Sequence, residues 1–382
     1  MFEIIDTEQG SDDMDTVIKV IGIGGAGGNA VDHMIREGVQ GVDFIIANTD
    51  AQALSRCLAQ TKVQLGKTGL GAGSKPEAGR AAAQESRDAI AAALEGAHMC
   101  FITAGMGGGT GTGAAPVVAE IAKEMGILTV AVVTKPFDFE NRIRVAESGV
   151  EELSKQVDSL IVVLNDKLLE VYGDDAGFED CFRSADNVLT SAVGGIAEII
   201  NVPGLVNVDF QDVRTAMAEM GRAMMGSAQA AGLDRARIAA EQAAVSPLLE
   251  GTELSGARCV LINITASRNL KMSEVRDAVK TVQAFAASEA FVKYGTVFDE
   301  NMEDRIRVTV VATGLGAVRA AVMPRKIEMV RTGTDNIGME IDYGNLELPA
   351  VIRRTSRTTV EAMSANGMST LDIPAFLRKQ AD

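Results

Sequence analysis

The residues best suited to chemistry lie in a glycine-dense stretch in the first third of the chain. Residues 104–113 read AGMGGGTGTG, between an apolar run at 98–103 and a helix-like run at 114–125. Such a loop lets backbone N–H groups approach a phosphate at the helix N-terminus, where the helix dipole also favours negative charge. Thr110 and Thr112 add hydroxyl donors. We therefore predict a phosphate-binding loop and not a flexible linker, because linkers do not lie between a buried strand and a helix.

A second glycine run follows an earlier strand-like segment, residues 17–23. Gly22, Gly24 and Gly27 fit the pattern G-x-G-x-x-G, and a helix is expected to begin after this loop. The pattern is typical of dinucleotide-binding loops, and the position of Asp50 after the next strand keeps a ribose-binding role open for it. Two glycine loops at one sheet edge favour a bound nucleotide over a purely structural role.

These loops belong to a regular alternation of strand-like and helix-like segments. The alternation predicts an α/β fold in which helices cover both faces of a parallel sheet. Ligands of such sheets bind beyond the carboxyl ends of the strands, where both glycine loops would lie. The strand-like segments are 17–23, 42–47, 62–65, 98–103, 127–133 and 158–164.

A long central helix is expected to connect this first half to a second one. Residues 178–200 carry apolar side chains at helical spacing over the whole segment. The segments beyond it predict a second, smaller α+β domain. Its expected elements are helices at 234–245 and 273–287 and strands at 258–265, 290–297 and 305–313.

Phe182 and Asp186 lie four residues apart, so they share one face of the long helix. A phenyl ring can stack on a purine. A carboxylate can accept two hydrogen bonds from guanine, whereas adenine offers no matching pair of donors. A core phenylalanine beside a solvated aspartate is the alternative interpretation.

Two further carboxylates, Asp209 and Asp212, stand where the next helix-like run begins. They fit an N-cap and a capping-box acid. They also fit a pair of exposed carboxylates that orient a water molecule. Neither glycine loop holds a general base, so any hydrolysis needs a base from elsewhere.

Composition narrows the possible functions. The chain has 382 residues, enough for two domains plus tails, and its net charge of −16 disfavours a nucleic-acid surface. Its four scattered cysteines suit a reducing cytosol, and its two histidines argue against a histidine-rich metal site.

Residues 66–68 resemble the end of a P-loop motif, but Thr61 replaces the glycine that this motif requires. Neither a signal peptide nor an apolar run long enough to span a bilayer is expected.

The two ends of the chain are expected to lack a fixed fold. Residues 1–15 are interpreted as a flexible arm and residues 317–369 as a flexible linker, because apolar periodicity is lost there. In the last segment, 370–382, Asp372 would cap a short helix that begins near Pro374. That helix would present an apolar side to a partner protein, formed by Ile373, Phe376 and Leu377.

Taken together, these motifs resemble the FtsZ family of bacterial tubulin-like division GTPases. The most specific element is GGGTGTG at 107–113, which looks like the signature loop of that family. The resemblance follows the order of the family's motifs and covers nearly the whole chain apart from the arm and the linker. The other matching segments are 24–29, 48–50, 165–167, 182–186, 207–213 and 371–379.

The resemblance implies three parts: a tubulin-like GTP-binding domain at 16–177, a central helix at 178–201 and a C-terminal GTPase-activating domain at 202–316. It implies GTP or GDP as the bound nucleotide, with Mg²⁺ held mainly by phosphates and water and no protein metal site. The implied phosphate contacts are Gly24, Gly25, Ala26, Gly27, Gly28 and Asn29 of the first loop, and Gly107, Gly108, Gly109, Thr110, Gly111 and Thr112 of the second.

The resemblance also implies how the rest of the nucleotide is held. Glu140 would contact the ribose with an arginine beside it, and Asn165 would receive guanine together with Phe182 and Asp186. The segment after Glu140 departs from the family pattern, because Asn141 replaces a glycine and the segment is shorter. The spacing from Glu140 selects Arg144, and Arg142 is the rival.

A head-to-tail filament is the further implication. Asn207, Asp209 and Asp212 would enter the nucleotide pocket of the next subunit and polarise the attacking water, so hydrolysis would depend on assembly. The C-terminal peptide would bind membrane tethers of the FtsA and ZipA type, so the membrane is reached only indirectly, and regulators would control assembly. The implied location is the cytoplasm at the mid-cell division site.

Two other functions stay open. A NAD(P)-dependent oxidoreductase would explain the first glycine loop but would leave the second one without a role. A scaffold that binds GTP without hydrolysing it would explain both loops and the tail.

Overall fold

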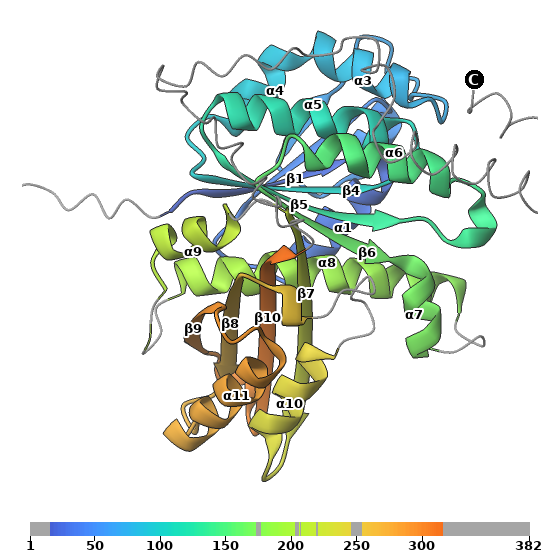
Figure 1. Cartoon of the computed structure of the whole chain (residues 1–382). Helices are drawn as coiled ribbons and strands as arrows, with labels where there is room; N and C mark the ends of the chain where they lie inside the picture. The colour runs from blue at the N-terminus through green and yellow to red at the C-terminus, as the bar shows by residue number, and fades with distance from the viewer. Residues whose placement is uncertain are drawn as a thin grey trace, which may run out of the picture. The chain divides into compact units, whose positions relative to one another are not determined.

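The structure, a computed structural model, describes residues 16–172, 177–202, 206, 208–218, 221–245 and 254–315. These residues build one ten-stranded sheet in the order β3-β2-β1-β4-β5-β6-β7-β10-β8-β9 (Figure 1). The expected arm, linker and partner peptide lie outside the described residues. Of the described helices, none is long and apolar enough to cross a membrane.

Six parallel strands form the first part of the sheet. Their side chains are buried on both faces: in β1, Ile21 and Ile23 join one core cluster, while Ile18 and Val20 join another. Strands covered on both faces need nearly continuous apolar runs, which is the pattern in the sequence. The strands are β1 (Ile18–Ile23), β2 (Asp43–Asn48), β3 (Thr61–Gln64), β4 (Met99–Gly105), β5 (Leu128–Lys135) and β6 (Ser159–Leu164).

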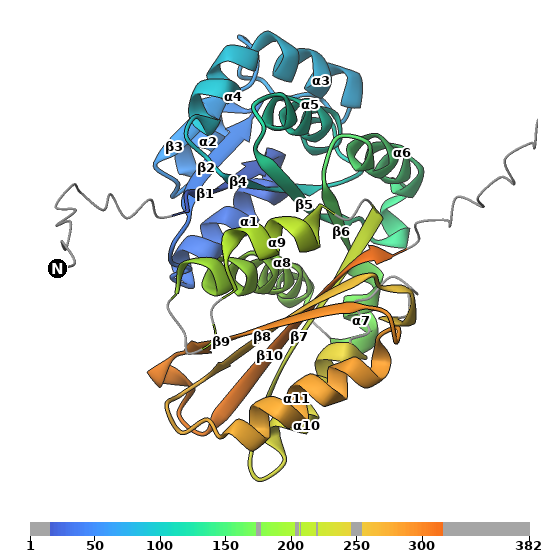
Figure 2. The same ribbon diagram turned by 60° about the vertical axis from the view of Figure 1, so that its left-hand side comes forward.

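Helices cover both faces of this part, as predicted. α1 and α8 pack on one face, and α3, α4, α5 and α6 pack on the other (Figures 1 and 2). The helices are α1 (Gly24–Arg36), α2 (Ala51–Arg56), α3 (Pro76–Glu85), α4 (Arg87–Leu94), α5 (Thr110–Glu124), α6 (Ile143–Ser154), α7 (Asn165–Tyr172) and α8 (Phe178–Asn201), with a 3-10 turn at Asp138–Glu140.

The second half has the expected α+β composition but continues the same sheet. β7 pairs with β6 at three positions and with β10 along most of its length. β7 is not expected from the sequence, because its residues, GRAMMGSAQAA, include no β-branched side chain. The elements are α9 (Phe210–Met217), β7 (Gly221–Ala231), α10 (Arg235–Ala244), β8 (Cys259–Ala266), α11 (Met272–Phe285), β9 (Phe291–Phe298) and β10 (Arg305–Leu315).

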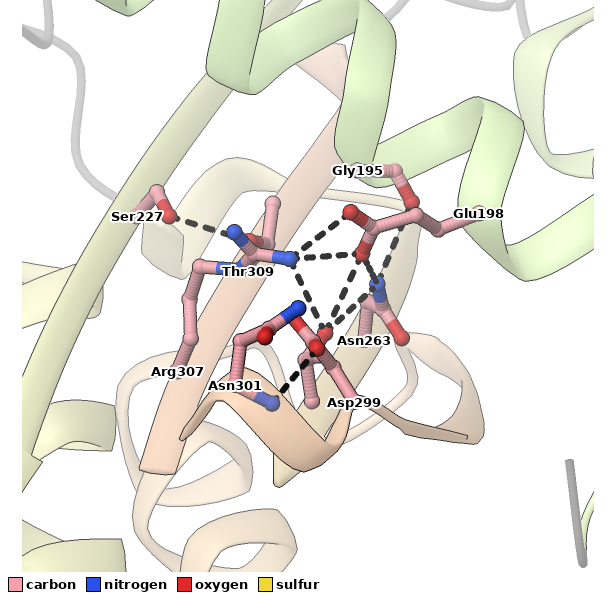
Figure 3. Close-up of polar contacts among 9 residues, drawn as sticks. Gly195, Glu198, Ser227, Asn263, Asp299, Asn301, Arg307 and Thr309 are labelled. Atoms are coloured by element: carbon pink, nitrogen blue, oxygen red, sulfur yellow. Dashed lines mark hydrogen bonds and ion pairs between the residues drawn. The ribbon is translucent and has the colours of Figure 1, made fainter. Parts of the chain in front are cut away.

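A polar cluster joins the end of α8 to this second half (Figure 3). Arg307 of β10 donates to both carboxylate oxygens of Glu198, at 2.7 and 2.8 Å. On β8, Thr265 donates to the same carboxylate at 3.2 Å, and the Asn263 amide lies 3.3 Å from the carbonyl oxygen of Gly195. Because α8 also packs on the parallel strands, the central helix contacts both halves of the sheet.

Candidate functional site

A cavity of about 340 Å³ opens at the carboxyl edge of the parallel strands. Its walls come from the residues that end or follow β1, β4, β5 and β6 and from the first turns of α8. This is where an open parallel sheet binds ligands, because the loops that follow neighbouring strands meet there. The lining residues are Ile23, Gly25, Ala26, Asn29, Gly105, Met106, Gly108, Gly109, Thr110, Gly111, Thr134, Pro136, Glu140, Arg142, Asn165, Phe182, Ala185, Asp186 and Leu189.

Two helices begin at this cavity without a side-chain cap. α1 starts at Gly24, so residues 24–29, expected as a loop, form its first turns. Neither Ile23 before α1 nor Gly109 before α5 caps its helix through a side chain, and neither first turn holds an acidic residue. The first backbone N–H groups of both helices are thus available to an anion, which both helix dipoles also favour.

The glycines of the two loops divide into packing positions and cavity positions. A Cβ atom on Gly27 or Gly113 would lie 2.4 or 1.9 Å from a neighbouring backbone carbonyl oxygen, so close packing requires these glycines. A Cβ atom on Gly25 or Gly108 would meet no atom of the described residues within 4 Å. Packing does not explain these two glycines, and the space beside them belongs to the cavity.

Three polar side chains near the loops are engaged by the protein itself. Thr110 Oγ1 lies 2.6 Å from Thr49 Oγ1 and lines the cavity. Thr112 is buried, and its Oγ1 accepts from the Gly107 N–H at 2.9 Å, so it shapes the loop instead of lining the cavity. Asp50 is the N-cap of α2, and its carboxylate accepts hydrogen bonds from two backbone N–H groups. Helix capping therefore explains the presence of this carboxylate.

Asn165 directly follows β6, and its side chain is nearly completely buried in the cavity wall. Among the residues that the structure describes, its Oδ1 atom has no hydrogen-bond partner. Buried polar atoms are normally satisfied, so this acceptor is suited to a donor group of a ligand.

Glu140 and Arg142 form an ion pair at the cavity wall. Arg144, which the spacing selected, lines a separate hollow between α3 and α6. The reason is that α6 begins at Ile143, so Arg142 is the residue before the helix and Arg144 already lies in its first turn. The geometry therefore favours the rival, Arg142, as the arginine of the cavity.

Phe182 and Asp186 both line the cavity from α8. Phe182 is 38% exposed and meets Phe137 edge to face, with 5.5 Å between ring centroids, so it is not a core side chain. Burial raises the pKa of Asp186 to about 6, and the nearby His33 and Arg36 oppose this rise. At neutral pH the Asp186 carboxylate is therefore mostly ionised and can accept two hydrogen bonds.

Asp209 and Asp212 do not line this cavity. Asp209 is the N-cap of α9, accepting from the Asp212 N–H at 2.7 Å, whereas the Asp212 carboxylate pairs with Lys293 of β9. The Phe210 ring packs on His98, the residue before β4, with 6.2 Å between centroids. The acids therefore lie at the amino edge of the sheet, separated from the cavity by the length of β4, roughly 23 Å at about 3.3 Å per residue.

Comparison with known proteins identifies the family. Residues 17–173 match the model of the Tubulin/FtsZ family GTPase domain, and residues 221–316 match that of the FtsZ family C-terminal domain. The chain is 50% identical over 404 residues to the cell division protein FtsZ of Pseudomonas putida, with 100% of both chains covered. The chain belongs to the FtsZ family.

Further comparisons agree with this assignment. The cell division protein FtsZ of Coxiella burnetii is 52% identical over 388 residues, with 99% of each chain covered. A solved FtsZ dimer of M. jannaschii, described as empty, has a TM-score of 0.75 at 42% identity and covers 79% of this chain and 89% of its own. CetZ1 of Haloferax volcanii, solved as a GDP-bound monomer, has a TM-score of 0.68 at 19% identity. The match covers 79% of this chain and 96% of the CetZ1 chain, and it shows a shared fold.

Membership in the FtsZ family confirms the tubulin-like fold, and it makes this FtsZ-family chain a GTP-binding GTPase of cell division. Most residues expected at the nucleotide line the cavity. Asn207 and the partner residues of the tail lie outside the described residues. The expected nucleotide-binding residues that do not line the cavity are Gly24, Gly27, Gly28, Gly107, Thr112 and Arg144.

Several wall residues of the FtsZ-family site were not expected from the sequence. Ala185 and Leu189 follow Phe182 by one and two helical turns, so helical spacing was a signal that could have found them. Met106 and Pro136 carry no such signal. They become wall residues because the neighbouring strands β4 and β5 end side by side, where the Met106 N–H donates to the Thr134 carbonyl oxygen at 2.9 Å.

Proposed function

We propose that this FtsZ-family chain polymerises head to tail and hydrolyses GTP at the contact between two copies. The observation that carries the proposal is the separation of the parts: the cavity lies at one edge of the sheet, and Asp209 and Asp212 lie at the other. One chain cannot bring these acids to its own cavity without disrupting its sheet, whereas a second copy stacked on the first can. A contact between unlike faces repeats into a filament when it does not close into a ring.

In the proposed complex the cavity holds GTP. The uncapped starts of α1 and α5 receive the phosphates, in the space beside Gly25 and Gly108. The Asp186 carboxylate accepts hydrogen bonds from the two adjacent N–H donors of guanine, and Asn165 Oδ1 accepts one from a further donor. Phe182 stacks on the base. This set of acceptors favours guanine over adenine.

Glu140 and Arg142 are assigned to the ribose side of the nucleotide, where the ion pair fixes both side chains. Mg²⁺ is expected to arrive with the nucleotide and to take its ligands from phosphates and water. Among the described residues, no three His, Cys, Asp or Glu side chains gather as a candidate metal site. The proposed Mg²⁺ neutralises phosphate charge.

Hydrolysis joins the oxygen of a water molecule to the γ-phosphorus and breaks the bond to the bridging oxygen, so that GDP leaves. Asp209 and Asp212 of the neighbouring copy are proposed to accept hydrogen bonds from this water and to orient it in line. The proton that the water loses ends on the released phosphate. The N–H groups at the start of α5 stabilise the charge that develops on the phosphate oxygens.

We also propose the cellular setting that the family implies. The filament would lie at the cytoplasmic side of the mid-cell division site, attached through residues 370–382 to tethers of the FtsA or ZipA type. A synthetic peptide of these residues should bind such a tether, and a peptide with Phe376→Ala and Leu377→Ala should not. Equal binding of both peptides would argue against a helical apolar recognition site.

The first test is GTP hydrolysis per subunit against protein concentration, with sedimentation of polymer measured in the same samples. A split site predicts a rate near zero at low concentration that rises as polymer appears. A constant rate without polymer would mean that each chain holds a complete site. A chain that binds GTP and never turns it over would be the scaffold, and one that binds NAD(P) and not GTP would be the oxidoreductase.

The second test mixes two variants that are each expected to turn GTP over much more slowly than the unaltered chain. Gly108→Asp places a carboxylate in the phosphate space but keeps the acids, whereas Asp212→Asn keeps the cavity but lacks one acid. In an equal mixture about a quarter of randomly formed contacts combine an intact cavity with intact acids, so turnover should return. Labelled Gly108→Asp chains must sediment with the mixed polymer. If they do and turnover does not return, the acids do not act across the contact.

A further inference from the structure

Asp212 is held from outside its own helix, by Lys293 of β9. The Lys293 Nζ atom lies 3.0 Å from Asp212 Oδ1 and 3.1 Å from Oδ2, so one ammonium group contacts both carboxylate oxygens. The Lys293 and Asp212 side chains are 35% and 30% exposed, so the pair is partly shielded from water yet reachable from the surface. The ammonium group also lies 5.4 Å from the centre of the Phe291 ring, a contact that favours a cation.

The strand that carries Lys293 is well anchored. β9 pairs in parallel with β8 along its whole length. Thr296 of β9 donates its N–H to the Val206 carbonyl oxygen at 3.2 Å, and its Oγ1 accepts from the Val206 N–H at 3.3 Å. Val206 belongs to the segment that leads into α9, so β9 is tied both to the sheet and to the approach of that helix.

This anchoring bears on how the two acids can orient a water molecule. One oxygen of the Asp209 carboxylate accepts from the Asp212 N–H, which fixes Asp209 as a helix cap. Among the described residues, Lys293 is the partner that holds the Asp212 carboxylate, so its loss would let this carboxylate rotate more freely about its side-chain torsions. Lys293 takes one lone pair on each Asp212 oxygen and leaves the others for a water molecule. Precise orientation of a reacting water is the main contribution that a protein makes to phosphoryl transfer.

We propose that Lys293 is a positioning residue for hydrolysis in the neighbouring copy: it holds Asp212 in the direction from which this acid orients the attacking water. The inference rests on the proposed head-to-tail GTPase. Lys293 acts through Asp212, so it sets the turnover of assembled chains without changing how tightly the cavity binds GTP.

The test compares Lys293→Gln, Lys293→Arg and the control Lys280→Gln, which removes an exposed lysine of α11. Turnover is measured per sedimented subunit at saturating GTP, and KM for GTP is measured separately. Lys293→Gln should lower turnover per sedimented subunit about tenfold or more, because one charged partner of Asp212 is lost, and should leave KM within about twofold. Lys293→Arg should recover much of the loss, and Lys280→Gln should match the unaltered chain.

A double-variant comparison separates positioning from a general effect on the surface. In the Asp212→Asn background, Lys293→Gln should cause no further loss, because its action requires the carboxylate. The inference is overturned if Lys293→Gln keeps normal turnover or if it only prevents polymer from forming. It is also overturned if Lys293→Gln lowers the turnover of Asp212→Asn by the same factor by which it lowers the turnover of the unaltered chain. Failure of the proposed function looks different: Asp212→Asn alone would then keep full turnover.

Discussion

The glycines of the second loop allow a matched experiment, in which the same methyl group is added at two positions. A Cβ atom on Gly113 would lie 1.9 Å from the Pro76 carbonyl oxygen and 2.7 Å from the Arg80 nitrogen. A Cβ atom on Gly108 would meet no atom within 4 Å in the part of the chain that the structure describes. Neither glycine has a φ in the left-handed region, so alanine is compatible with the backbone at both. The two variants therefore separate packing from ligand binding.

The expected magnitudes follow from these distances. Gly113→Ala must push α3 away from α5, and overpacking of this kind costs about 3 kcal/mol in the free energy of unfolding. Gly108→Ala should leave that free energy unchanged or raise it by about 0.5 kcal/mol, since alanine restricts the unfolded chain. The methyl group of Gly108→Ala enters the phosphate space. Loss of one charge-assisted N–H contact there should raise the Kd for GTP about 10- to 100-fold.

The chain has no tryptophan, so unfolding in urea without nucleotide is best followed by circular dichroism. GTP affinity is measured by the anisotropy of a fluorescent GTP analogue. If Gly108→Ala binds GTP within about twofold of the unaltered chain, a phosphate does not occupy that space. If Gly113→Ala unfolds at the normal urea concentration, the contact between α3 and α5 is not as tight as its geometry indicates.

Four further outcomes are expected. Asp186→Asn should bind GTP at least about 100-fold more weakly and accept xanthosine triphosphate instead, whose base presents a carbonyl where guanine has an amine. Because the pKa of Asp186 is about 6, GTP affinity should fall between pH 7 and 5 as the carboxylate gains a proton, and the Asn variant should not show this fall in a titration by anisotropy. Arg142→Ala should raise the Kd for GTP about tenfold, whereas Arg144→Ala should leave this Kd unchanged. The reverse result would mean that Arg144, which the spacing from Glu140 selects, contacts the nucleotide. Arg235→Met should lower the free energy of unfolding in urea by about 3 kcal/mol, because Arg235 is buried and its Nε lies 2.7 Å from a Glu274 oxygen, with GTP affinity retained.

Local sequence signals were enough for the parts of the fold in which each segment carries its own pattern. The parallel strands have apolar runs that only a sheet covered on both faces can bury, and α8 has helical spacing over its whole length. Phe182 and Asp186 were found for the same reason, because helical spacing places them on one face. β7 was missed because its side chains show no strand preference. It is held in the sheet by backbone pairing with β10 and, at three positions, with β6.

Within the site, residue types alone did not reveal which glycines pack and which face the cavity. Gly27 and Gly25 look alike in the sequence, yet only Gly27 would clash with a distant backbone atom if it carried a side chain. Arg142 and Arg144 look alike in the same way, and the residue at which α6 begins separates them.

The sequence by itself determined the chemistry that is available: two glycine loops for phosphates, acceptors suited to guanine and two acids at the start of a helix. It did so because each of these signals is local. Only the tertiary structure decided where they lie, with the acids at one sheet edge, the cavity at the other and Lys293 beside Asp212. Those positions depend on strand pairing and helix packing between residues far apart in the chain, and no local pattern encodes them.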